Sequence, residues 1–263
     1  ISMGTAGMKA SLISREVVAD SIELAIEGHQ LDGVVCIVGC DKTIPAAAMA
    51  LARMDIPGLV YYGGTIMPGV IGDREVSVQE VFEAIGAHAA GRMDDDGLRA
   101  VESAVCPGAG ACGGQFTANT MAMALSVMGI SPMGANDVPA VDPAKAAEGE
   151  RCGRLIVERV FAGDTARKYI TRASLKNAAV AVSASGGSTN AVMHLTAIAA
   201  EAGMPPALHR LERLLDEYST ADGLDPGRRT RLIAAIRAEA QHAGIEDALG
   251  LPADAGPAEA IPR

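Results

Sequence analysis

A short apolar run that ends in Gly-Cys-Asp-Lys constrains the fold of this chain more than any other sequence feature. Residues 33–39 are almost wholly apolar and bounded by glycine, which is typical of a short buried strand. The run leads into the polar residues 40–42, and residues 46–54 then show a helical pattern. A second apolar run at 58–62 ends in a glycine pair. The order strand, loop, helix, strand predicts a βαβ unit.

The same order of apolar run, small-residue loop and helical pattern recurs along the chain. A loop rich in Gly and Cys at 106–114 precedes a helical pattern at 117–128. The run 178–183 is predicted to be a further strand, followed by the loop 185–190 and a helix through Ala202. Repeated units of this kind predict an α/β fold with a mostly parallel sheet and flanking helices. In such sheets, sites lie beyond the carboxyl ends of the strands, so the polar loops are expected to converge.

The composition changes near residue 204. Residues 1–204 contain the Gly-rich loops, and a helix with Ser14 as its N-cap is predicted near the start of the chain. Beyond this point the glycine-rich loops stop, and residues 208–218 and 228–243 have the pattern of charged amphipathic helices. We therefore expect an α/β domain over 1–204 and a helical tail of separate origin, with a frayed end, over 205–263.

Charge and cysteine content exclude several classes of protein. A net charge of -10 argues against a nucleic-acid surface, because phosphate binding needs clustered Lys and Arg. Five Cys, an odd number without even spacing, predict reduced thiols or metal ligands and a cytoplasmic location rather than a disulfide framework. Neither a signal peptide nor an apolar run of roughly 18 residues is found, so no membrane partner is expected. Because the chain opens with Ile1 and not Met, we expect it to begin inside a longer protein.

Candidate metal ligands lie in two of the loops. Cys40 is a soft ligand suited to iron–sulfur clusters or zinc, and the adjacent Asp41 is a hard ligand suited to magnesium. Lys42 can bind a metal only after it loses its charge or is carbamylated. Cys112 lies among small residues that let a bulky group approach the backbone. The alternative to metal binding is a structural role, in which Cys40 packs at the end of the strand and Asp41 and Lys42 are solvated loop charges. The other three Cys are expected to be structural.

The loop at 185–190 has two interpretations. Its N–H groups and the hydroxyls of Ser188 and Thr189 open a helix and suit a carboxylate or phosphate. The same hydroxyls can instead cap the helix by accepting hydrogen bonds from its first amides. The sequence favours neither.

Several long motifs resemble those of the dihydroxy-acid/6-phosphogluconate dehydratase family. The run 39–53 is similar to the first signature of that family, and the run 106–121 to its second cysteine motif. Residues 1–16 and 185–191 also match, so the resemblance extends over about residues 1–204. The Ala-Cys-Gly-Gly sequence around Cys112 looks more like the dihydroxy-acid branch than the sugar-acid branches.

This resemblance implies a fold, a metal centre and a reaction. The domain would be an incomplete N-terminal α/β domain of the dehydratase. Cys40 and Cys112 would bind an iron–sulfur cluster, either 2Fe-2S or 4Fe-4S, and Asp41 with carbamylated Lys42 would hold Mg²⁺. The substrate would be a small 2,3-dihydroxy carboxylic acid that loses water to give a 2-oxo acid. The implied pathway is valine and isoleucine biosynthesis, and the full-length parent is expected to be a homodimer.

Other expected parts of the site have no counterpart in this chain. In the family, a first cluster cysteine and an acidic metal ligand precede the stretch that matches 1–4, and a later Glu and the catalytic Ser base lie in a C-terminal domain. We therefore expect no catalytic base here and an isolated chain that is inactive. The alternatives are a sugar-acid dehydratase of the same family and a non-catalytic remnant that binds no cluster. A nucleotide-binding domain is disfavoured, because neither G-x-G-x-x-G after a strand nor a phosphate loop is present.

The predicted tail, residues 205–263, resembles a different protein. About 45 residues over 208–251 weakly resemble a segment of the large cobaltochelatase subunit. This resemblance implies a fused or misassembled reading frame and includes no catalytic motif.

Overall fold

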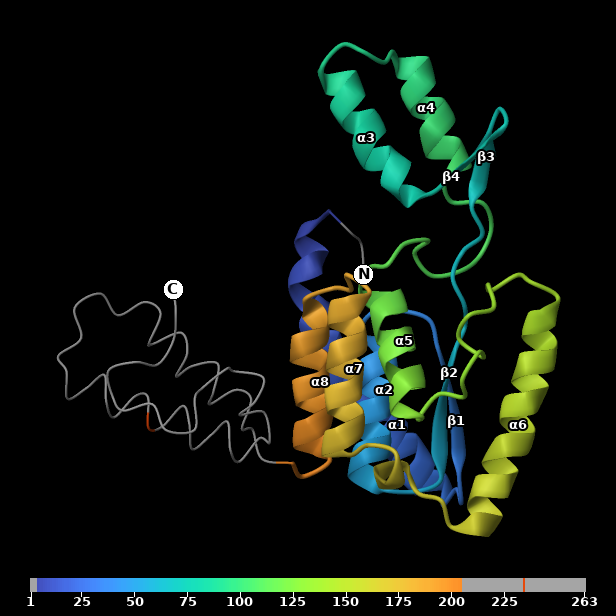
Figure 1. Ribbon diagram of the computed structural model, residues 1–263, viewed down its shortest axis with the longest axis vertical. Helices are drawn as coiled ribbons and strands as arrows, with labels where there is room; N and C mark the ends of the chain where they lie inside the picture. The colour runs from blue at the N-terminus through green and yellow to red at the C-terminus, as the bar shows by residue number, and fades with distance from the viewer. Residues whose placement is uncertain (1–3, 205–233, 235–263) are drawn as a thin grey trace. The chain divides into compact units, whose positions relative to one another are not determined.

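The computed structural model describes residues 4–204 and Ala234. The chain divides into two compact units, 1–202 and 203–263, and the account that follows concerns the first (Figure 1). The helices and the frayed end predicted within 205–263 lie outside the described residues. Among the residues described, no helix combines the length and apolarity needed to cross a bilayer.

The first unit is a mixed α/β domain, as predicted from the sequence, and helices dominate it. Its elements in chain order are η1 (Ala6–Ala10), α1 (Ser11–His29), β1 (Val34–Val38), α2 (Thr43–Met54), β2 (Gly58–Tyr62), β3 (Gly69–Ile71), β4 (Arg74–Val76), α3 (Val78–Ala89), α4 (Asp95–Ala104), α5 (Thr117–Met128), α6 (Ala144–Ala162), η2 (Ala166–Lys168), α7 (Arg172–Ala184) and α8 (Asn190–Glu201).

The predicted βαβ unit is confirmed. β1 and β2 pair in parallel, in a register that runs from Val34 opposite Gly58 to Val38 opposite Tyr62, and α2 connects them. The parallel sheet is small, because β1 and β2 are its two strands in the described part of the chain. β3 and β4 form a separate antiparallel hairpin that the sequence did not predict.

Helices lie on both sides of the β1–β2 sheet (Figure 1), and β2 is buried along its whole length, whereas Ile37 of β1 is 72% exposed. On one face Leu59 and Tyr61 pack with Cys152 of α6. On the other face α2 lies so close that a Cβ on Gly58 would be 2.5 Å from Cδ2 of Leu51. Burial on both faces explains why β2 is a continuous apolar run rather than an alternating one.

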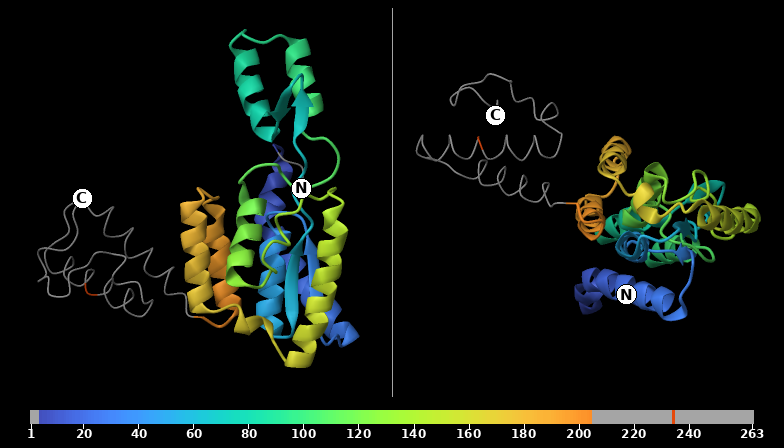
Figure 2. Two further views of the ribbon diagram at one scale, coloured as in Figure 1. Left: turned by 45° about the vertical axis from the view of Figure 1, so that its right-hand side comes forward. Right: turned by 90° about the horizontal axis from the view of Figure 1, so that it is seen from below.

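α2 is the central helix of the unit. Its residues from Ile44 to Ala52 are all buried, and it packs against α1, α5 and α8. α7 packs in turn against α5 and α8 (Figures 1 and 2). At its carboxyl end, Arg53 donates to Asp20 of α1 at 2.6 Å and to both carboxylate oxygens of Glu201 of α8, at 2.7 and 2.8 Å. These charged hydrogen bonds of Arg53 fix α1, α2 and α8 relative to one another.

Two local predictions were wrong. Residues 178–183 form no strand; they lie inside α7. That helix begins at a capping box, in which Thr171 accepts from the Ser174 N–H at 3.1 Å and the Ser174 hydroxyl accepts from the Thr171 N–H at 2.9 Å. A short apolar run fits a helix as well as a strand, and this cap decides between them. Ser14 is not an N-cap, because α1 begins at Ser11 and the Ser14 hydroxyl donates to the Ser11 carbonyl.

The capping box predicts a stability difference between two threonines. Thr171→Ala removes a side-chain cap and is expected to lower the free energy of unfolding by about 1 kcal/mol. Thr165→Ala is the matched control, because Thr165 precedes η2 without a side-chain cap bond. Urea unfolding followed by circular dichroism measures both. Equal stabilities of the two variants would contradict the assigned start of α7.

Candidate metal centre

The chain beyond β2 continues as an extended segment, residues 63–66, that lies between two loops. On one side the Gly63 N–H donates to the Val38 carbonyl at 2.7 Å, which continues the pairing with β1. Cys40 follows two residues after Val38. The segment therefore fixes the backbone from which Cys40 leaves the sheet.

The other side of the same segment binds the loop that contains Cys112. The Ala111 N–H donates to the Gly64 carbonyl at 2.9 Å, and the Ile66 N–H donates to the Ala111 carbonyl at 2.8 Å. Thr65 and Ala111 thereby form a single parallel bridge. Cys112 is the next residue, so one extended segment connects the backbones of the two candidate cysteine ligands.

Side chains hold the Cys112 carbonyl from two directions. The Thr65 hydroxyl donates to it at 3.1 Å and the Asn119 amide at 2.9 Å. Asn119 also accepts from the Tyr62 hydroxyl at 2.7 Å. The last residue of β2 and the first turn of α5 are thus connected through the loop that contains Cys112.

Gly110 is required for this close approach. Its φ is +144°, which side-chain-bearing residues rarely adopt, and a Cβ there would be 2.4 Å from the Ile66 nitrogen. Gly108 in the same loop also has a positive φ, +85°, but a Cβ there would meet nothing within 4 Å. Gly110 therefore permits the contact between the loop and segment 63–66.

Cys40, Asp41 and Lys42 form a connected chain of polar groups at the start of α2. The Cys40 thiol donates to Asp41 Oδ1 at 3.3 Å, and Lys42 forms an ion pair with Asp41 Oδ2. Desolvation raises the pKa of the Cys40 thiol, and the bond to Asp41 and the charge of Cys112 add to the rise. Burial acts to raise the pKa of Asp41, but hydrogen bonds from Lys42 and Cys40 outweigh it and leave that pKa below its ordinary value. Asp41 is therefore an anion beside a protonated thiol.

Cys40 and Cys112 are near enough to influence each other. The pKa of Cys40 responds to Cys112, and that of Tyr62 responds to both. Burial raises the pKa of Tyr62, and the two cysteines raise it further. Both cysteine side chains are exposed, so a metal can reach them. Two thiols that are far apart in sequence therefore lie in the same region of the fold.

Two residues that the sequence did not single out lie beside this site. Arg15 of α1 and His194 of α8 are buried, and Arg15 Nη1 is 3.2 Å from His194 Nδ1. His194 is in electrostatic range of Asp41 and Lys42. His194 has no partner at ligand spacing in the sequence, so only the fold makes it a candidate.

The loop 185–190 lies against α5 rather than after a strand. The Ser188 hydroxyl is 2.8 Å from the Thr117 hydroxyl, and the Ser188 N–H donates to Thr120 at 3.0 Å. The Asn190 N–H donates to Ser188 at 3.3 Å, whereas Thr189 makes no side-chain cap bond. Ser188 is therefore engaged as a helix cap, and Thr189 is exposed at the surface.

The remaining cysteines differ from Cys40 and Cys112. Cys36 and Cys152 are buried in the core, and burial raises the pKa of Cys36 to about 12. Cys106 is exposed and lies at the start of the loop that contains Cys112. The loop follows α4, so the expectation that a strand precedes it was wrong.

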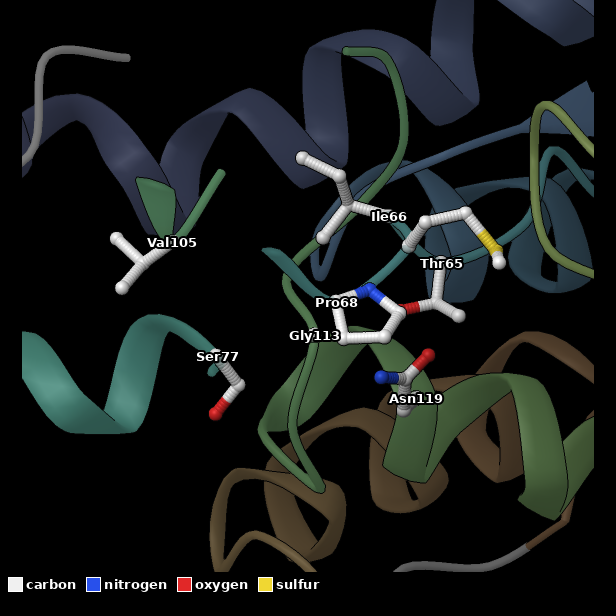
Figure 3. Close-up of a pocket in the computed structure, with 8 residues that line it drawn as sticks. Thr65, Ile66, Pro68, Ser77, Val105, Gly113 and Asn119 are labelled. Carbon is white, nitrogen blue, oxygen red and sulfur yellow. The ribbon is translucent and has the colours of Figure 1, made fainter. Parts of the chain in front are cut away.

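A cavity of about 250 Å³ adjoins the Cys112 loop (Figure 3). Thr65, Asn119 and Gly113 line it together with Ser77 and Val105. Ile66, Met67 and Pro68 complete the lining. The residues that hold the Cys112 carbonyl therefore also face an open space.

The candidate donors in the described residues are two thiols, one carboxylate and one lysine. Within residues 4–204 and Ala234, no group of three or more His, Cys, Asp and Glu side chains is placed to hold a metal ion. Cys40 and Cys112 supply two soft donors, and Asp41, paired with Lys42, lies directly beside Cys40. An α/β domain with thiols from two loops next to a carboxylate–lysine pair has the donor chemistry of a mixed soft and hard metal centre.

Comparisons with known proteins place the chain in a family. Residues 1–238 match the family model described as dihydroxy-acid/6-phosphogluconate dehydratase N-terminal. The chain belongs to this family. The match extends beyond residue 204 into the predicted tail.

Several curated proteins named dihydroxy-acid dehydratase are similar to this chain. The relative from Koribacter versatilis is 57% identical over 201 residues, which are 76% of this chain and 35% of that protein. The relative from Roseiflexus castenholzii is 47% identical over 245 residues, 93% of this chain and 42% of that protein. A relative from Thermus thermophilus is 47% identical over 237 residues, 90% of this chain and 40% of that protein. The chain therefore spans well under half the length of these relatives.

Two glycines of the Cys112 loop test its geometry. Gly110→Ala is expected to lower the free energy of unfolding by at least about 2 kcal/mol, because it adds a backbone clash to an unfavourable φ. Gly108→Ala has the unfavourable φ without the clash, so it should lower the free energy of unfolding by about 1 kcal/mol. Urea denaturation of both variants gives the comparison. A Gly110→Ala variant as stable as the Gly108→Ala variant would show that the loop does not contact segment 63–66 as described.

Proposed function

We propose that this chain supplies part of the metal centre of a dihydroxy-acid dehydratase. In this proposal Cys40 and Cys112 bind an iron–sulfur cluster, of the 2Fe-2S or 4Fe-4S type, and Asp41 and carbamylated Lys42 bind Mg²⁺. The observation that supports it is the extended segment 63–66, which is hydrogen-bonded on one side next to Cys40 and on the other next to Cys112. The names of the relatives favour the dihydroxy-acid branch over a sugar-acid dehydratase.

The reaction of the proposed enzyme removes water from a 2,3-dihydroxy carboxylic acid. A base takes the C2 proton, the 3-hydroxyl leaves, and the resulting enol becomes a 2-oxo acid. The metal centre, when bound, supplies Lewis-acid stabilisation of the departing hydroxyl. The proposed pathway is valine and isoleucine biosynthesis in the cytoplasm, with a homodimeric full-length enzyme.

The residues of this chain have binding and positioning roles in that reaction. Asp41 is ionised and half-buried beside Lys42, and its carboxylate is a hard donor. Ser188 and Thr189 are proposed as weak contacts for the substrate carboxylate, in competition with the capping role of Ser188. The serine base and the remaining metal ligands are proposed to lie in parts of the enzyme that this chain does not contain. The isolated chain is therefore proposed to be inactive.

Residues 205–263 remain proposed as a separate helical tail. The family match continues to residue 238, so the first part of this segment also carries family sequence. The division of the chain into compact units at residues 202 and 203 supports a domain boundary near residue 204.

Anaerobic reconstitution of the chain with iron and sulfide tests the cysteine assignment. We expect visible charge-transfer absorption from the wild-type chain and at least about tenfold weaker iron retention in Cys40→Ser and Cys112→Ser. Cys106→Ser is the matched control, because Cys106 is exposed in the same loop. Iron retention should weaken as the pH falls, because a metal must displace the proton of Cys40, whose pKa is raised.

Two results would contradict this proposal. One is a wild-type chain that takes up iron and sulfide without charge-transfer absorption, which would favour a non-catalytic remnant. The other is absorption that survives both serine substitutions, which would place the thiolate ligands elsewhere.

A further inference from the structure

The side chain of His194 has a buried ring nitrogen without a partner. The residue lies on α8 and is fully buried. Its Nδ1 is 3.2 Å from Arg15 Nη1, but its Nε2 has no hydrogen-bond partner among the residues that the structure describes. Buried polar groups in folded proteins are nearly always paired, so this nitrogen indicates a missing group.

The contact with Arg15 fixes which ring nitrogen carries the proton. A guanidinium group has only donors, so Nδ1 of His194 must be the acceptor. Burial, followed by the charges of Lys42 and Arg15, lowers the pKa of His194 to about 4, and the ring is neutral at neutral pH. The single proton of the neutral ring is therefore on Nε2. The missing group must be an acceptor.

The neighbouring charges identify where that acceptor can arise. Lys42 and Asp41 are the site residues in electrostatic range of His194, and Asp41 already accepts from Lys42 and Cys40. An ammonium group can only donate, so unmodified Lys42 cannot satisfy Nε2. A carbamate on the same nitrogen can, because it has anionic oxygens.

Carbamylation needs only carbon dioxide as co-reactant. The Lys42 ammonium first releases a proton to water, and the amine lone pair then forms an N–C bond to CO₂ while one C=O π pair moves to oxygen. Loss of the second N–H proton to water leaves the carbamate, so that one ammonium and one CO₂ give one carbamate and two protons. The ion pair between Lys42 and Asp41 is lost, and Asp41 becomes free to bind a cation.

We propose that the Nε2–H of His194 donates a hydrogen bond to the carbamate of Lys42 and makes His194 the residue that positions it. This inference rests on the proposed function, because it assumes that Lys42 is carbamylated. Arg15 acts through His194 by holding the required tautomer. The three residues come from α1, the start of α2 and α8, the same helices that Arg53 connects at the opposite end of α2.

Carbon-13 NMR of the full chain with labelled bicarbonate and Mg²⁺ tests the inference. The wild-type chain should show a carbamate resonance that is absent in Lys42→Arg. His194→Met removes the donor and should raise the bicarbonate concentration for half-carbamylation about tenfold or more. His194→Gln keeps a donor, and its bicarbonate concentration for half-carbamylation should be within about threefold of the wild-type value. His29→Met is the matched control, because His29 is exposed.

A second measurement on the wild-type chain does not depend on the stability of any variant. With nitrogen-15-labelled histidine, the resonance of His194 should show a proton on Nε2, and bicarbonate should shift it in the wild type but not in Lys42→Arg.

The outcomes separate the two proposals. If no carbamate resonance depends on Lys42, both the proposed role of Lys42 and this inference are wrong. If the resonance is present but neither His194→Met nor the histidine spectrum responds, only the inference is wrong.

Discussion

The extended segment beyond β2 is the interaction on which the candidate centre depends. The backbone of residues 63–66 forms hydrogen bonds on two sides. On one side its partner is Val38, two residues ahead of Cys40, and on the other it is Ala111, the residue that precedes Cys112. Backbone hydrogen bonds are directional, so this double pairing sets where both cysteines leave the fold. The contact requires Gly110, because a side chain there would clash with the Ile66 backbone. The site is thus determined by the backbone before any side chain binds a metal.

Helix packing adds a second kind of chemistry beside the thiols. α1, α2 and α8 bury Arg15, Lys42 and His194 at one end of their shared interface, with Asp41 as the neighbouring anion. At the other end Arg53 pairs with Asp20 and Glu201. Buried cations need compensating acceptors, and a carbamate on Lys42 would supply one. Soft and hard donors therefore lie side by side because one loop connects β1 to α2.

The sequence predicted the parts of the fold that local pattern determines. The apolar runs at 34–38 and 58–62 are strands, and burial on both faces accounts for the continuous apolar residues of the second. The helices at 117–128 and 190–201 follow small-residue loops as expected. The run at 178–183 was misread because apolar length alone does not separate a strand from a helix. Residue type and family resemblance predicted Cys40, Asp41, Lys42 and Cys112 as candidate ligands, and that assignment stays a prediction. His194 was not predicted, because its partner Arg15 is 179 positions away in sequence and only the tertiary structure brings them together.

The most direct test of the account is whether the two thiols meet in the folded chain. Dibromobimane reacts with thiols at two positions and becomes fluorescent when both have reacted, so it reports a nearby pair. The account predicts a fluorescent product that joins the Cys40 and Cys112 peptides in mass spectra, lost in Cys40→Ser and retained in Cys106→Ser. Single modification of both cysteines without a bridge between them, in a chain that remains folded, would contradict it.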